Sequence, residues 1–224
     1  MAKDFNDPRV VESYDQHIRK LIPGYELIHL QVHAMLANLL PESAEVVVVG
    51  CGTGYELAYL AQQFPRWKFC AIDPAPNMLK QAEQYIKQLK LDEQVRFILA
   101  DSHVLTEMPE QFDAALAILV SHFVPLQHKL GFFQDIAGSL KSGGICLSYD
   151  LMQLQYPKQG QVLKSLAQLT GLAEQQAEKM LERLAGDFHL ISIEEMLELY
   201  QQAGFHQPQQ YSQVINYAGI FAQK

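Results

Sequence analysis

The stretch EVVVVGCGTGYE, residues 45–56, constrains the fold of this chain more than any other. Its run of β-branched residues predicts a buried strand, which is followed at once by Gly50, Gly52 and Gly54. Glycine adopts backbone angles and permits close approaches that a Cβ atom would prevent. A helix that begins at such a turn also presents free N–H groups at the positive end of its dipole. We therefore predict a strand–turn–helix unit that binds an anionic or strongly polar ligand group.

Beyond this turn, short apolar runs alternate with helical stretches. Strands are predicted at 45–49, 67–72, 94–99, 112–119 and 144–150, and helices at 54–63, 76–90 and 126–140. Strands that are apolar along their whole length indicate a parallel sheet covered by helices on both faces. The tail, residues 206–224, predicts a closing hairpin. We therefore expect an α/β, Rossmann-like mixed sheet.

Charge and cysteine content narrow the classes of function. A formal net charge of −8 disfavours broad binding to a nucleic-acid backbone, because such binders present a basic face. Cys51, Cys70 and Cys146 are widely spaced and form no CxxC pair, so a reduced, cytoplasmic setting is expected. The opening MAKDFNDPRV lacks the apolar run of a signal peptide, and no run reaches membrane-spanning length. We expect neither nucleic acid nor a membrane as a partner.

An acid on the next strand indicates which ligand the turn binds. Dinucleotide folds use GxGxxG, and because Tyr55 follows GxGxG here, a nicotinamide dehydrogenase is disfavoured and S-adenosylmethionine is favoured. The strand WKFCAID ends at Asp73, 23 residues beyond Gly50. Its carboxylate can accept hydrogen bonds from both hydroxyls of a ribose. Its alternative role is to cap the helix that follows Pro74.

A third feature, a pair of polar residues, follows the next strand. FILADSHVL places Asp101 and Ser102 where that strand ends. Asp101 can accept from an adenine amino group and the Ser102 backbone N–H can donate to a ring nitrogen, although capping of a short helix is an equal alternative. The three features stand at the carboxyl ends of successive strands, where open α/β sheets bind ligands. We therefore expect them to share one crevice.

Five segments together resemble the class I S-adenosylmethionine-dependent methyltransferase family over residues 45–150: VVVVGCGTG, CAID, LADS, FDAALAILVSHFV and LKSGGICLSYD. The resemblance implies a seven-stranded sheet with an antiparallel last strand, S-adenosylmethionine as cofactor and S-adenosylhomocysteine as product. It also implies a set of cofactor-binding residues in the turn and at the strand ends: Gly50, Cys51, Gly52, Gly54, Asp73, Pro74, Met78, Asp101, Ser102 and Ile118. Many members carry an acid two residues before the first glycine, where this chain has Val48.

A narrower resemblance joins the chain to the carboxy-S-adenosylmethionine synthase family, which serves tRNA wobble-uridine modification. LIPGYELIHLQVHAML and YQQAGF are similar to segments of that family, and Tyr25 matches a cofactor-contacting tyrosine. The family binds the extra carboxylate with an arginine, a position that we assign to Leu199, and has an asparagine where Ile118 stands. Because a buried carboxylate without a cationic partner is costly, we predict the plain cofactor.

The chain is predicted to be a single methyltransferase domain with four parts. Residues 1–41 form an N-terminal helical lid and residues 42–150 the cofactor-binding core. Residues 151–190 form a helical insertion after strand five, and residues 191–224 a C-terminal helix and hairpin. The apolar stripe of the insertion is compatible with core packing or with a homodimer interface.

Three side chains are candidates for the chemistry itself. His122, which follows strand four in ILVSHFVP, is the best candidate for a general base, although packing or capping is at least as good an account. Tyr14 is a candidate substrate contact in the lid, and Tyr25 a lid contact to the cofactor. The histidines are scattered, so no metal site is predicted.

We predict transfer of a methyl group to a small-molecule acceptor. One alternative is a carboxy-S-adenosylmethionine synthase-like or tRNA-modification-related enzyme. A second is a protein that binds S-adenosylmethionine or S-adenosylhomocysteine without catalysis, which Val48 makes credible. The sequence does not identify the acceptor, because fold does not determine function.

Overall fold

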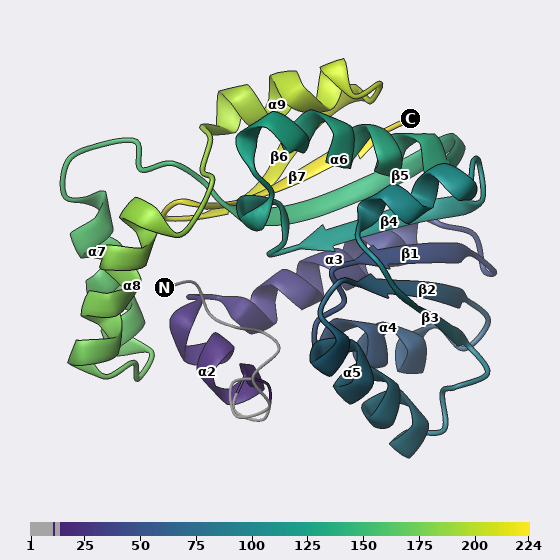
Figure 1. Ribbon diagram of the computed structural model, residues 1–224, viewed down its shortest axis with the longest axis horizontal. Coiled ribbons are helices and arrows are strands. Elements are labelled where there is room, and N and C mark those ends of the chain that lie inside the picture. Colours follow the sequence, from purple (N-terminus) through teal and green to yellow (C-terminus); the bar gives the residue numbers. More distant parts are fainter. Residues whose placement is uncertain (1–10, 12–13) are drawn as a thin grey trace.

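The structure is a computed structural model and describes residue 11 and residues 14–224 (Figure 1). Its seven strands are β1 (Glu45–Val49), β2 (Lys68–Asp73), β3 (Val95–Leu99), β4 (Phe112–Ile118), β5 (Leu140–Leu151), β6 (His206–Val214) and β7 (Tyr217–Gln223). They form one sheet in the order β3-β2-β1-β4-β5-β7-β6. Strands β1 to β5 pair in parallel, whereas β7 pairs antiparallel with β5 and β6. The predicted mixed sheet is therefore confirmed.

Helices cover both faces of this sheet (Figure 1). They are α2 (Tyr14–Leu21), α3 (Tyr25–Leu39), α4 (Tyr55–Gln63), α5 (Pro76–Gln88), α6 (Leu126–Ser139), α7 (Gln159–Leu169), α8 (Glu174–Gly186) and α9 (Ile193–Gln202), with 3-10 turns η1 (Ser102–Glu107) and η2 (Ser121–Phe123). Figure 1 shows α6 and α9 above the sheet and α4 and α5 below it. The pair α7 and α8 stands apart from the sheet, at the end that also carries α2. Helix α2 and the pair α7 and α8 therefore lie beyond one end of the strands.

The sheet has an apolar core on each face. Successive residues of a strand point to opposite faces, and β1 divides its valines accordingly. Val47 and Val49 pack in the cluster that includes α6 and α9, whereas Val46 and Val48 pack in the cluster that includes α3, α4 and α5. A third cluster joins α2, α3, α7 and α8 to the end of β5. Because both faces are filled, a ligand site is left at the edge where the strands end.

The observed elements follow the predicted ones closely. Strand β5 begins earlier than predicted, at Leu140, because Leu140 already pairs with Phe112 before a shift in register. The predicted N-terminal helical lid at residues 1–41 lies partly outside the described residues. The short turn η2, which carries His122, was not predicted. Among the described residues, no helix is both long enough and apolar enough to cross a membrane.

Candidate functional site

The glycine turn between β1 and α4 is anchored to the neighbouring strand. The Gly50 N–H donates to the Ile72 carbonyl at 2.7 Å. A Cβ atom on Gly52 would meet no atom within 4 Å, whereas a Cβ on Gly54 would lie 3.0 Å from the Cα of Ala82. All three turn glycines have positive φ angles. Gly54 therefore lets α5 pack closely against the turn, and Gly52 leaves the turn open.

The Asp73 carboxylate is held beside this turn. One of its oxygens accepts from the Gly52 N–H and the other from the Ala75 N–H, each at 2.8 Å. The side chain is buried, and burial raises the pKa of the Asp73 carboxyl, against the opposing effect of the two backbone donors. Each carboxylate oxygen still has a free lone pair. The N-cap of α5 is Ala75 rather than Asp73, so the predicted capping role is wrong, and Asp73 keeps the capacity to accept ribose hydroxyls.

A cavity of about 1010 Å³ opens over the turn and the strand ends. Eight of the predicted site residues line it: Tyr14, Gly50, Gly52, Asp73, Pro74, Met78, Asp101 and Ser102. Its apolar lining includes Ile72, Met78 and Val120, and residues of α6 also line it. Pockets for cofactors and other small molecules have volumes of roughly 300–1,000 Å³, so this cavity has room for a nucleoside-sized cofactor. A buried carboxylate, an open glycine and an apolar wall together fit an adenosyl group.

Four predicted cofactor contacts do not line this cavity. Cys51 is buried under the turn, and Gly54 is closed off by α5. Tyr25 is buried in the lid, where its ring lies 4.7 Å from that of His29. Ile118 packs between two apolar clusters. For these residues the structure offers packing roles, and their ligand contacts stay predictions.

A second, smaller cavity of about 60 Å³ adjoins the first. Tyr14, Leu119 and Phe123 line both cavities and form the wall between them. Leu119 has a φ of 63°, and its N–H donates to the Tyr149 carbonyl at 2.6 Å. A left-handed conformation is strained for a leucine, and such strain is common at functional sites. His122 lines the smaller cavity rather than the larger one.

His122 is held by a fully buried acid. Its Nδ1 lies 2.7 Å from an Asp150 oxygen, and the backbone N–H groups of Ser121 and His122 donate to the same carboxylate at 3.3 Å. The buried Lys129 ammonium donates to the Ser121 carbonyl. Burial lowers the pKa of the Lys129 ammonium, while the negative charge of Asp150 opposes that change. Because the Asp150 carboxylate accepts a hydrogen bond from Nδ1–H, the Nε2 atom of a neutral His122 ring carries no hydrogen and can take up a proton.

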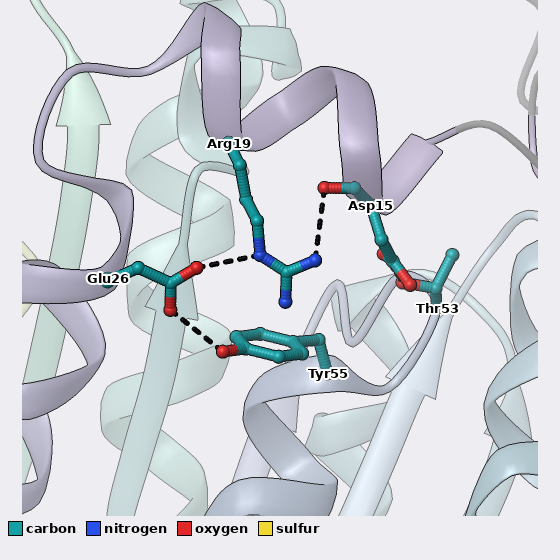
Figure 2. A network of polar contacts seen from close by, with 5 residues as sticks. All are labelled: Asp15, Arg19, Glu26, Thr53 and Tyr55. Atoms are coloured by element: carbon teal, nitrogen blue, oxygen red, sulfur yellow. Dashed lines mark hydrogen bonds and ion pairs between the residues drawn. The ribbon is translucent and has the colours of Figure 1, made fainter. Parts of the chain in front are cut away.

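A polar network joins the lid to the glycine turn (Figure 2). Thr53, inside the turn, donates its hydroxyl to Asp15 of α2 at 2.6 Å. Glu26 accepts from both Arg19 and the Tyr55 hydroxyl, at 2.7 and 2.8 Å. The Arg19 guanidinium lies 4.3 Å above the Tyr55 ring. Because Val48 leaves the turn without the usual strand acid, Asp15 supplies a carboxylate to it from the lid.

The position that we matched to the family's carboxylate-binding arginine lies away from both cavities. Leu199 packs against the core cluster beneath α9 and lines neither cavity. Helices α2 and α8 reach the smaller cavity, and α8 brings Arg183 there. The sequence signal for Arg183 was only its place in an amphipathic insertion. Asp150, which ends the LKSGGICLSYD motif, was likewise missed as a partner of His122.

Comparisons with known proteins agree with this architecture. Residues 47–146 match the family model described as a methyltransferase domain. A carboxy-S-adenosyl-L-methionine synthase from Trichlorobacter lovleyi is 22% identical over 97% of this chain and 91% of its own length. A biotin biosynthesis bifunctional protein from Teredinibacter turnerae is 34% identical, but over only 43% of this chain and 17% of its own.

Solved structures share the fold at low identity. A SAM-dependent methyltransferase from Aquifex aeolicus superposes with a TM-score of 0.66 and 18% identity, covering 97% of this chain and 98% of its own. An O-methyltransferase family protein from Burkholderia thailandensis gives a TM-score of 0.71 at 16% identity, and this chain covers 60% of it. The chain therefore has the fold of S-adenosylmethionine-dependent methyltransferases, and its residues 47–146 match the methyltransferase-domain model, which implies S-adenosylmethionine as the cofactor.

Proposed function

We propose that this protein transfers a methyl group from S-adenosylmethionine to a small molecule bound in the smaller cavity. The observation that carries the proposal is the shared wall: the cavity that fits an adenosyl group adjoins a second one lined by His122. The small size and largely apolar lining of that second cavity favour a small acceptor over a macromolecule. The cofactor supplies an activated methyl group on a sulfonium, so the protein need not provide an electrophile.

The residues of this chain then have three tasks. Asp73 and the open turn at Gly52 bind and orient the cofactor, and correct orientation can lower a barrier by about 7–11 kcal/mol. Tyr14 and Phe123, in the wall between the cavities, exclude water from the reacting groups. When the methyl acceptor must lose a proton before it attacks, Nε2 of His122 takes up that proton. Asp150 fixes the orientation and the tautomer of the His122 ring. His122 is the proposed catalytic base and Asp150 a positioning residue.

A second candidate function is that of a carboxy-S-adenosylmethionine synthase-like enzyme. It is favoured by the near full-length similarity to the Trichlorobacter lovleyi protein. The absence of an arginine at Leu199 no longer argues against it, because α9 does not reach either cavity and Arg183 does. The two functions differ in the cofactor that they handle, and mass spectrometry of the small molecules that copurify with the protein separates them.

The decisive experiment measures cofactor binding and turnover separately. Calorimetry should show binding of S-adenosylhomocysteine, and a panel of hydroxyl-, amine- and acid-bearing small molecules should yield S-adenosylhomocysteine from S-adenosylmethionine. Tight binding without turnover across the panel would contradict methyl transfer and support a non-catalytic binder. A copurifying ligand heavier than S-adenosylmethionine by one carboxylate would favour the synthase-like function.

A further inference from the structure

One charged side chain in the smaller cavity has no part in the proposed methyl transfer. Arg183 lines this cavity from α8, between the apolar Met180 and Leu184. Its Nε donates to Asp187 at 2.9 Å, within the same helical end. Among the described residues, the two terminal nitrogens of the guanidinium have no hydrogen-bond partner. A guanidinium fork that is only partly paired is suited to bind a planar anion through two parallel hydrogen bonds.

Arg183 and His122 both contact the same aromatic ring, that of Phe188. The Arg183 guanidinium carbon is 5.1 Å from the centroid of the Phe188 ring, and the His122 ring meets Phe188 edge-on at 5.1 Å. The remaining lining is largely apolar, with Ile22 and Leu151 among its residues. A volume of about 60 Å³ has room for about four to six water-sized groups. A molecule that spans this space must therefore be short and apolar between its two polar ends.

We propose that the acceptor is a small apolar acid, whose carboxylate is bound by Arg183 and whose opposite end faces His122 and the wall shared with the cofactor cavity. The proposal rests on the proposed function and adds the substrate class. It explains why a cavity with apolar walls contains an arginine. It also assigns Phe188 a place in the middle of the ligand, where its ring packs against the apolar part.

A purely structural role for Arg183 is the competing account. Arginine in the last turn of a helix stabilises the helix end, and Arg183 and Asp187 form an (i, i+4) ion pair. If the role of Arg183 is purely structural, replacing Arg183 or Asp187 has the same effect on ligand affinity. If Arg183 binds the ligand, the two substitutions have opposite effects on ligand affinity, because Asp187 competes with the ligand for the guanidinium.

The test uses the full chain saturated with S-adenosylhomocysteine, titrated by calorimetry with propanoate and with butanoate. Their uncharged amides are the matched probes. The acids should bind at least about tenfold more tightly than the amides, the effect expected for a hydrogen bond to a charged group. R183M should abolish this preference, and D187N should keep or increase it. R66M removes an exposed arginine that pairs with Glu42 at the other end of the sheet, and should change nothing.

The outcomes separate this inference from the proposed function. If S-adenosylhomocysteine binds but acids and amides bind equally, the acid-acceptor inference is overturned and methyl transfer is untouched. If S-adenosylhomocysteine itself does not bind, the proposed function fails first. Equal losses in R183M and D187N favour the structural account and overturn ours. Carboxy-S-adenosylmethionine that binds more tightly than the plain cofactor, through Arg183, would move the anion to the cofactor and also overturn it.

Discussion

The two cavities are built in different ways, although they share a wall. The larger one is formed chiefly by the ends of parallel strands and the turns that follow them, with Asp73 held by backbone N–H groups. The smaller one is formed chiefly by side chains of α2, η2 and α8 that meet in space, among them Arg183 and His122. The first offers fixed backbone and the acids Asp73, Asp101 and Asp135, which suits an invariant cofactor. The second offers side chains, which suits a variable acceptor.

The largest effect is expected when the Asp73 carboxylate is removed from the larger cavity. Asp73→Ala should weaken S-adenosylhomocysteine binding by about 3–6 kcal/mol, because two charge-assisted hydrogen bonds of about 1.5–3 kcal/mol each are lost. Calorimetry measures the affinity. Asp92→Ala, which removes an exposed acid before β3, is the control and should bind normally. Unchanged affinity in Asp73→Ala would place the cofactor elsewhere.

The base in the smaller cavity should affect turnover without affecting the cofactor. With an acceptor found in the panel, His122→Ala should lower kcat by about 10²–10⁴-fold and leave S-adenosylhomocysteine affinity unchanged. Added imidazole should restore part of the rate if Nε2 removes a proton, a rescue that lost packing alone would not give. His206→Ala, on the exposed edge strand, is the matched control. Full activity in His122→Ala would leave the smaller cavity without a base.

The difference between the two cavities also explains which site residues could be predicted from the sequence. Gly50 and Asp73 were predicted because the chemistry of a strand and its turn is local, and parallel pairing then brings successive strand ends to one edge. Arg183 was missed because its place depends on how α8 packs beside η2, which no local pattern encodes. The Asp150 partner of His122, 28 residues along the chain, required the register of β4 and β5. Leu199 was matched to the family's arginine by sequence resemblance, which carries no information on which helix lines the smaller cavity.

Two substitutions in the glycine turn distinguish a glycine that is needed for close packing from one that faces open space. Gly54→Ala should destabilise the protein by about 2–4 kcal/mol, since it combines overpacking against Ala82 with left-handed strain. Gly52→Ala carries only the strain, about 1–2 kcal/mol, because its Cβ meets nothing within 4 Å. Denaturant unfolding measures both free energies. Equal losses would show that Gly54 has no special packing role.

The smallest expected effect tests whether the lid supports the turn. Thr53→Val removes the hydroxyl that donates to Asp15, and should cost about 0.5–1.5 kcal/mol of S-adenosylhomocysteine affinity, because the turn loses the carboxylate that α2 supplies in place of an acid at Val48. Tyr55→Phe removes the more exposed contact to Glu26 and should change the affinity by less. Calorimetry on both variants gives the comparison. A larger loss in Tyr55→Phe would mean that the lid is held by the Arg19–Glu26 group, and that the turn is set by the sheet alone.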